Sequence, residues 1–314
     1  MQEYKSPLYL LNGHAATMYP ALFRNLPVVE LIGERIDTPD DDFLQLDWVK
    51  NGSKKLVIVS HGLEGNSRRH YMLGMAKTFS ENNFDVLLWN YRSCGPVMNR
   101  TLRFYHSGAT DDLTTVINHA INKGYSEISL IGFSLGGNLT LKYLGEKAQN
   151  IPTQIKKSVV FSVPCDLSAS AAHLNKWYNK IYCNRFLNSL KFKVTFKSQK
   201  FEILQERLHL LKTIKTLREF DDNFTAPLHG FDDAADYYEQ CSSINYIDKI
   251  TVPCLIINAL NDPFLPTDCY PIKAVENNAM VFLEMPNDGG HCGFTSSGEA
   301  YWSEIRAVDF CVGL

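Results

Sequence analysis

Residues 128–144 limit the folds open to this chain more than any other segment. The apolar run over 128–131 predicts a buried strand, and the apolar residues spaced over 139–144 predict a helix. Between them stands Gly132-Phe133-Ser134-Leu135-Gly136. A G-x-S-x-G sequence between a strand and a helix is typical of a nucleophile elbow, a sharp, strained turn that exposes the serine hydroxyl. Ser134 is therefore a candidate nucleophile; the alternative is an ordinary surface serine on a glycine-containing turn.

Short apolar strands alternate with amphipathic helices along most of the chain. The expected strands cover residues 28–36, 43–49, 56–60, 84–89, 128–131, 159–163, 254–260 and 280–284. The expected helices cover residues 70–80, 111–121, the stretch after Ser134 to about 147, and 301–310. Because strands that alternate with helices pair in parallel, we expect an α/β protein with a mostly parallel central sheet and helices on both faces. The first two strands predict an antiparallel pair, and residues 1–26 look irregular.

The strand–helix rhythm stops at Pro164 and resumes only at Cys254. The intervening segment, about 90 residues long, is largely helical in pattern and too long to be a plain loop. We therefore expect an α/β core at residues 1–166 and 247–314, interrupted by an inserted helical cap at residues 167–246. A cap in that position is expected to decide which substrate reaches the serine.

A serine hydroxyl is a weak nucleophile, so Ser134 needs a base, and the base needs an acid to orient it. In the fold that hosts this elbow, the acid and then the histidine follow the serine along the chain. His291 is the candidate base because it follows the last expected strand, whereas the other histidines after Ser134 lie in the cap. Asp262 is the candidate acid because it directly follows the preceding strand, and Asp268 on the same loop is the fallback. The alternatives are a surface histidine and an Asx-Pro turn residue.

The negatively charged oxygen that forms during acyl transfer needs hydrogen-bond donors held ready for it. One donor is expected to be the backbone N–H of Leu135, directly after the nucleophile. The second is expected to come from the loop after the strand at 56–60, and the N–H of Leu63 is the candidate. His61 precedes it in His61-Gly62-Leu63-Glu64-Gly65, and we interpret this histidine as a support for the loop rather than as a catalytic residue.

Several motifs together resemble the α/β-hydrolase superfamily and, within it, the YheT-like group, which is related to the embryogenesis-associated proteins. The motifs are Asn12-Gly13-His14, residues 61–65, Asn90-Tyr91-Arg92 with Asn99-Arg100, Tyr105-His106-Ser107-Gly108 with Asp112, the elbow, Phe220-Asp221 with Gly230-Phe231, Asn261-Asp262-Pro263, and Gly290-His291. The resemblance implies a triad of Ser134, Asp262 and His291, in agreement with the spacing. The chain departs from the group's pattern at Ala16, where Gln is usual, and at Ser93, where Gly usually follows the arginine.

Composition excludes several classes of function. The formal net charge of −3 gives no indication of nucleic-acid binding. The eight cysteines form no C-x-x-C pair, and the N-terminus shows neither a long apolar stretch nor a signal-peptide cleavage site, so we expect reduced thiols in the cytoplasm. No run approaches the roughly 20 apolar residues of a membrane span. No metal-ligand spacing and no phosphate-binding glycine loop is present, so we expect neither a metal nor an organic cofactor.

The expected cap carries a local charge bias. Residues 176–218 contain eleven Lys or Arg and two acidic residues, and an apolar stripe at helical spacing comprises Phe201, Leu204, Leu208 and Leu211. One interpretation is a weak contact between a basic amphipathic cap and an anionic membrane surface or a substrate phosphate. The favoured interpretation is a cap helix with one face packed on the protein and the other in solvent.

Together these features predict a serine hydrolase that cleaves small-molecule carboxylic esters through an acyl-enzyme, without a cofactor. An apolar acyl group of short or medium length, or a lipid ester, fits the cap and the family resemblance. Two alternatives stay open: an acyltransferase that passes the acyl group to an alcohol, and a non-catalytic binding module on the same fold. The sequence does not indicate the acyl length, the alcohol portion or the oligomeric state.

Overall fold

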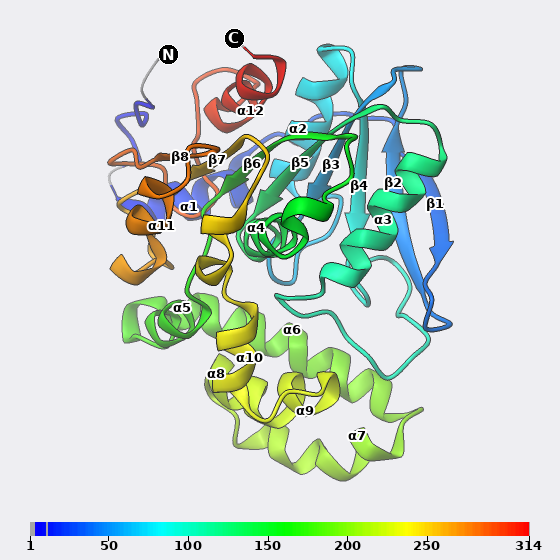
Figure 1. Cartoon of the computed structure of the whole chain (residues 1–314). Coiled ribbons are helices and arrows are strands. Elements are labelled where there is room, and N and C mark those ends of the chain that lie inside the picture. The colour runs from blue at the N-terminus through cyan, green and yellow to red at the C-terminus, as the bar shows by residue number, and fades with distance from the viewer. Residues whose placement is uncertain (1–3, 11, 314) are drawn as a thin grey trace.

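The computed structural model describes residues 4–10 and 12–313, which fold around a central eight-stranded sheet (Figure 1). The strand order is β1-β2-β4-β3-β5-β6-β7-β8; β2 runs antiparallel to β1 and β4, and the other neighbours are parallel. The strands are β1 (Ile32–Asp37), β2 (Phe43–Val49), β3 (Lys55–Ser60), β4 (Asp85–Asn90), β5 (Glu127–Phe133), β6 (Ile155–Phe161), β7 (Cys254–Ile257) and β8 (Val281–Glu284). The predicted α/β class, the mostly parallel sheet and the antiparallel first pair are confirmed.

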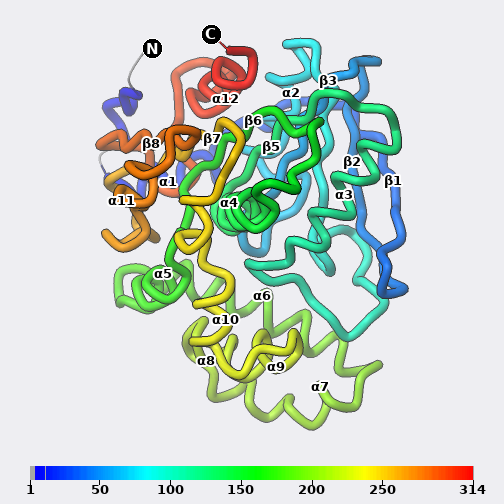
Figure 2. Tube along the Cα trace, viewed as in Figure 1, coloured from blue at the N-terminus to red at the C-terminus, as the bar shows by residue number. Residues whose placement is uncertain are grey.

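Helices cover both faces of this sheet. The helices α3 (Thr110–Asn122) and α4 (Leu135–Lys147) lie in front of the strands in the view of Figure 2 and share one apolar core with them. The helices α2 (His70–Glu81) and α12 (Trp302–Val312) contribute to a second core on the opposite face. Because both faces of the central strands are buried, residues 56–59 of β3 are all apolar and fully buried rather than alternating.

The segment between β6 and β7 is helical and lies at one end of the sheet (Figure 1). Its helices are α5 (Leu167–Leu174), α6 (Lys180–Ser198), α7 (Glu202–Arg207), α8 (Leu217–Phe220), the π-helix Asp221–Thr225, α9 (Ala226–His229) and α10 (Ala234–Cys241). Many of their apolar side chains form a separate cluster, which also includes Phe264 and Leu265 from the loop after β7. In the predicted stripe, Leu204 and Leu211 are buried in this cluster, and Phe201 and Leu208 pack against it.

Three local predictions were wrong. The strand expected at 28–36 begins only at Ile32. Residues 13–23, expected to be irregular, form α1 (Gly13–Phe23), because the Asn12 side chain accepts a hydrogen bond from the Ala15 N–H at 2.9 Å and caps the helix. The strand expected at 254–260 ends at Ile257. There the amide side chain of Asn258 takes over the pairing, accepting from the Val163 N–H at 2.7 Å and donating to its carbonyl at 3.1 Å.

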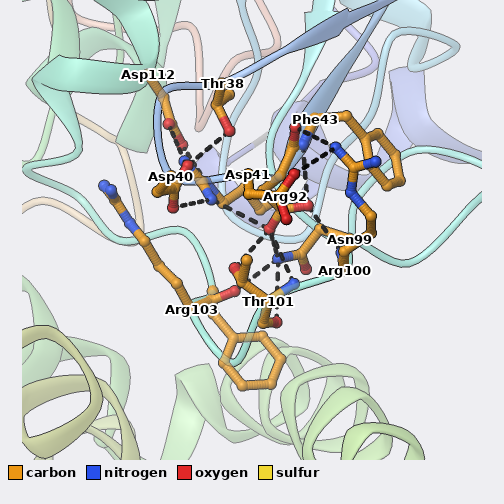
Figure 3. A network of polar contacts seen from close by, with 12 residues as sticks. Thr38, Asp40, Asp41, Phe43, Arg92, Asn99, Arg100, Thr101, Arg103 and Asp112 are labelled. Carbon is orange, nitrogen blue, oxygen red and sulfur yellow. Dashed lines mark hydrogen bonds and ion pairs between the residues drawn. The ribbon is translucent and has the colours of Figure 1, made fainter.

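A buried polar network ties the β1–β2 turn to the loop after β4 and to α3 (Figure 3). The Arg92 guanidinium donates to both carboxylate oxygens of Asp112, at 2.8 and 2.7 Å. It also donates to Asp40 at 2.7 Å and to Asp42 at 3.1 Å. The arginine motif that resembles the YheT-like group therefore lies in a structural network. Ser93, where that group usually has Gly, has a φ of 63°, a conformation that favours glycine.

Candidate active site

Ser134 lies at the turn between β5 and α4 with a φ of 53° and a ψ of −119°. This strained backbone is the conformation expected of a nucleophile elbow. Glycines on either side make the turn feasible. A Cβ on Gly132 would lie 2.5 Å from the Gly136 carbonyl oxygen, and a Cβ on Gly136 would lie 2.3 Å from the Ser60 carbonyl oxygen. The close approach of α4 to β3 and β5 therefore depends on these two glycines.

The structure brings Ser134, His291 and Asp262 into one hydrogen-bonded chain. His291 Nε2 lies 2.9 Å from Ser134 Oγ, and His291 Nδ1 lies 2.9 Å from one Asp262 oxygen and 3.1 Å from the other. The side chain of Asp262 is fully buried. The fallback Asp268 is exposed, in the 3₁₀ helix Thr267–Cys269, and no hydrogen bond or ion pair joins it to His291 among the described residues.

Asp262 is itself held by its local turn, since its carboxylate accepts from the Phe264 N–H at 2.8 Å. The Phe264 ring stacks on His291 with centroids 4.0 Å apart. Burial acts to lower the pKa of His291, but the Asp262 carboxylate outweighs it, so the pKa lies above the ordinary value of a histidine. Helix α1 fixes the backbone of the same loop, because Thr17 Oγ1 accepts from the His291 N–H at 2.8 Å. The sequence analysis did not predict that α1 supports the His291 loop. Asn12, a residue type that favours the N-cap position, was the signal for this helix.

The loop after β3 lies against the candidate nucleophile. A Cβ on Gly62 would lie 3.1 Å from the Cβ of Ser134. Within the described residues, the N–H groups of Leu63 and Leu135 donate to no other protein group, so both remain available as donors. His61 is fully buried and contacts Gly62 O at 2.8 Å and the Tyr91 N–H at 3.3 Å. Burial lowers the pKa of His61 to about 3, so it is neutral, as a loop support should be.

Glu64, directly after Leu63, is fixed by hydrogen bonds that sequence reasoning did not find. Its φ is 52°, at the position of the 62–65 turn where a type II turn requires a positive φ. Its carboxylate accepts from Tyr105 Oη at 2.6 Å, from Lys193 Nζ at 2.7 Å and from the Ser189 hydroxyl. Lys193 and Ser189 belong to α6, so a helix of the inserted segment is tied directly to the loop that carries Leu63.

A family model described as the alpha/beta hydrolase fold matches residues 55–296, which is more than half of the chain and includes the hydrogen-bonded chain of Ser134, His291 and Asp262. The chain belongs to the α/β-hydrolase family. The Escherichia coli (strain K12) protein named "Putative esterase YheT" is 33% identical to it over 308 residues, which cover 95% of this chain and 90% of that protein. The predicted resemblance to the YheT-like group is confirmed.

A further sequence relative and a solved structure are also similar to this chain. Phospholipase ABHD3 of Bos taurus is 28% identical to this α/β-hydrolase, covering 93% of the chain and 73% of that protein. The solved structure of the Pyrococcus furiosus esterase Pf2001 matches with a TM-score of 0.61 at 19% identity, covering 92% of this chain and 96% of that one, and supports the fold. The relatives named esterase and phospholipase place this α/β-hydrolase among the esterase- or lipase-like hydrolases.

A cavity of about 780 Å³, counting the space open to solvent, adjoins the candidate triad of this α/β-hydrolase. Ser134 and His291 line it together with both candidate oxyanion donors, Leu63 and Leu135. Its apolar wall includes Leu167, Leu174, Phe186, Leu190, Leu217 and Phe264. A polar part includes His106, Ser107, Asp221, Thr225, Tyr237 and Tyr238. The inserted segment and the α/β core thus build the cavity together.

Two lysines of the basic segment point into the protein rather than toward solvent. Lys193 binds Glu64, and Lys197 donates to the carbonyl oxygens of Thr101 and Arg103 at 2.7 and 2.9 Å. Among residues 4–10 and 12–313, no helix is long and apolar enough to cross a membrane. The same residues contain no group of three or more His, Cys, Asp or Glu side chains arranged to hold a metal ion.

Proposed function

We propose that this α/β-hydrolase is a serine esterase that cleaves small-molecule carboxylic esters through an acyl-enzyme. The observation that carries the proposal is the continuous hydrogen-bonded chain from Ser134 through His291 to Asp262, opening on an apolar cavity. A serine, a histidine and a buried carboxylate in this arrangement are the parts that nucleophilic acyl transfer requires. The relatives named esterase and phospholipase support the same class of reaction.

Each residue has one role in this proposal. Ser134 Oγ attacks the ester carbonyl while His291 Nε2 takes its proton, and His291 then returns that proton to the leaving alcohol. Asp262 holds His291 with Nδ1–H toward the carboxylate and stabilises the imidazolium. The N–H groups of Leu63 and Leu135 donate to the oxyanion. A water molecule then attacks the acyl-enzyme, again with His291 as the base, and Ser134 is regenerated.

The substrate proposal rests on the cavity. Leucine and phenylalanine side chains form most of its wall, which suits an apolar acyl group of short or medium length or a lipid ester. We assign residues 167–246 as the cap that selects this substrate and residues 1–166 and 247–314 as the α/β core. We retain the cytoplasm as the proposed location, in keeping with eight cysteines that are all unpaired.

A series of p-nitrophenyl esters with acyl chains of two to sixteen carbons tests the proposal. We expect turnover with an optimum at short or medium length, and we expect Ser134→Ala to abolish it. Absence of turnover across the whole series, or full turnover by the Ser134→Ala variant, would contradict the proposal. Product analysis with added alcohol separates hydrolysis from acyl transfer, and inertness of the wild type would favour the binding module.

A further inference from the structure

The polar part of the cavity contains a carboxylate with no cation beside it. Asp221 begins the π-helix and lines the cavity that Ser134 and His291 also line. Its two oxygens accept from Thr225 Oγ1 at 2.5 Å and from Tyr238 Oη at 2.7 Å. Among the described residues no Lys, Arg or His forms an ion pair with it, whereas the neighbouring Asp222 lies 4.0 Å from Arg218.

An ionisable group in this setting is costly to the fold. Burial raises the pKa of Asp221 to about 6, and the hydrogen bonds from Thr225 and Tyr238 only partly offset it. At neutral pH the group is mostly a carboxylate, with two hydrogen bonds and room for more. A partly buried charge with no cation beside it is costly, and π-turns within helices occur frequently at functional sites. A ligand that donates a further hydrogen bond to the Asp221 carboxylate would offset this free-energy cost.

The same cavity also contains an unused donor. His106 Nδ1 accepts from the Gly108 N–H at 3.2 Å, so the proton of the neutral ring is on Nε2. Burial lowers the pKa of His106 well below the ordinary value, which keeps the ring neutral. No acceptor for Nε2 is present among the described residues, although His106 lines the cavity. The cavity thus presents an acceptor and a donor, and a hydroxyl group complements both because it donates and accepts. A quaternary ammonium group has no acceptor atom, so it would leave the Nε2–H of His106 without a partner.

From these contacts we infer that Asp221 and His106 form a subsite that recognises a hydroxyl group on the ester substrate. The subsite lies in the cavity of the proposed esterase, so the inference rests on the proposed function and specifies its substrate class. The hydroxyl can belong to the alcohol portion, as in a glycerol or other polyol ester, or to a hydroxylated acyl chain. A site that hydrogen-bonds a substrate hydroxyl discriminates strongly against the analogue that lacks it, because its buried polar groups are then left unpaired.

Matched substrate pairs test the inference. For the alcohol side, 1-octanoylglycerol is compared with propyl octanoate, which differs only by the two missing hydroxyls. For the acyl side, p-nitrophenyl 8-hydroxyoctanoate is compared with p-nitrophenyl octanoate. In the wild type we expect kcat/KM to favour the hydroxylated member of at least one pair by about tenfold or more, the effect of one hydrogen bond to a charged acceptor. The pair that shows the preference identifies which side of the ester carries the hydroxyl.

The variant Asp221→Asn keeps the shape of the side chain and removes its charge. We expect the preference to fall by about tenfold in this variant, and to persist in the matched control Asp222→Asn, the exposed neighbour. Because the substitution removes a charge that has no cation beside it, Asp221→Asn should melt at a temperature no lower than the wild type does. A variant that melts much lower and loses activity equally on both members of each pair would show a purely structural Asp221 and overturn the inference.

The wild-type measurement stands even if the variant fails to fold. Wild-type enzyme that turns over these esters without preference for either hydroxylated member would overturn the subsite and leave the proposed esterase intact. Wild-type enzyme that turns over none of them would count against the proposed function itself. A preference found only for octanoylcholine over its neutral isostere 3,3-dimethylbutyl octanoate would replace hydroxyl recognition with cation recognition.

Discussion

Ser134 is one of several residues in the site with a backbone that L-amino acids rarely adopt. Non-glycine residues with positive φ in the loops around it are Glu64, Ser134 itself, Ser162, Cys292 and Phe294. Each such residue costs of order 1–3 kcal/mol and persists only where its surroundings enforce it. In this chain the enforcing contacts are visible: Ser162 Oγ, for example, accepts from the Cys292 N–H at 2.8 Å, beside His291. Residues with strained backbone therefore gather in the loops that hold Ser134 and His291 within hydrogen-bonding distance of each other.

Replacing Asp262 with Asn should change both the rate and its pH dependence. His291 acts as a base only when neutral, so the wild-type rate falls as pH drops through the pKa of His291, which Asp262 raises. In Asp262→Asn that pKa falls, so the acid limb of kcat/KM moves to lower pH, while the plateau drops by about 10³- to 10⁴-fold because the tautomer is no longer fixed. The pH–rate profiles of both proteins measure this. An acid limb that stays in place or moves to higher pH would refute the assigned role.

Gly136→Ala should disrupt the elbow. The added Cβ would lie 2.3 Å from the Ser60 carbonyl oxygen and 2.6 Å from that of His61, and backbone cannot yield as a side-chain end can. We expect a loss of about 2 kcal/mol or more in the free energy of unfolding, together with loss of ester turnover. Gly33→Ala in β1 is the control, since its nearest atom outside the adjacent residues would be 3.9 Å away. Urea unfolding measures both, and equal stability of the two variants would count against the close approach of α4 and β3.

Helix α6 does more than cover the cavity, because it reaches the loop that carries Leu63. Lys193 and Ser189 hold the Glu64 carboxylate, and Arg69 Nη2 donates to the Glu64 carbonyl oxygen at 3.0 Å. The side chains of Lys193 and Glu64 are both nearly inaccessible to solvent. Glu64, the residue directly after Leu63, is thus held at its carbonyl oxygen by Arg69 and at its carboxylate by α6.

Lys193→Met should therefore slow the chemical step more than it weakens substrate binding. Misplacing one oxyanion donor lowers kcat by about tenfold to hundredfold, with little change in KM. Lys180→Met is the control and should match the wild type, because this partly exposed lysine on the same helix donates to Asn175 and Lys215 and not to Glu64. Ser189→Ala, which removes a neutral hydroxyl donor and leaves the Lys193 cation in place, should give a smaller loss in the same direction. A folded Lys193→Met protein with wild-type kcat would show that α6 does not position the loop.

Elements could be predicted from the sequence where a local pattern determines them. The strand at 128–131 and the helix after Ser134 were predicted because apolar periodicity and the glycines of the elbow act within a few residues. Helix α1 was missed because its Pro20 and Gly13 are usually turn signals, and its exposed Leu22 and Phe23 obscure an apolar face. Glu64 was missed because its partners come from Tyr105 and from α6, more than 40 and 120 residues away. Contacts of that separation leave no periodic signal in one sequence.

At the scale of the whole molecule, the Arg92 network joins the antiparallel edge of the sheet to the loop after β4 and to α3. Asp42 has no exposed side-chain surface and accepts from Asn99, Thr101 and the backbone as well as from Arg92. Burial acts to raise the pKa of Asp42, but these hydrogen bonds outweigh it and hold the pKa well below the ordinary range. Stability from a carboxyl with a lowered pKa is present above its unfolded pKa, about 3.9, and is lost as the pH falls through the folded pKa.

Asp42→Asn should accordingly lower the free energy of unfolding at pH 7 by about 3 kcal/mol, because Arg92 loses a charged partner in the interior. The difference in the free energy of unfolding between the variant and the wild type should shrink as the pH falls below about 4. Below that pH the ionised Asp42 of the wild type contributes progressively less stability. Urea unfolding of both proteins at pH 7 and pH 3 measures the change. A difference that is constant or larger at pH 3 would contradict the role given to Asp42.

Covalent labelling decides whether Ser134 is an activated nucleophile. A fluorophosphonate reacts with a serine whose proton is removed by a neighbouring base, and intact-protein mass spectrometry counts the adducts. We expect one adduct on the wild type, mapped to the peptide that contains Ser134, and none on Ser134→Ala. We expect His291→Ala to label far more slowly, because Nε2 lies 2.9 Å from Ser134 Oγ and is the only base in this chain of contacts. An unlabelled wild type, or a Ser134→Ala protein that labels equally well, would contradict the proposed serine esterase.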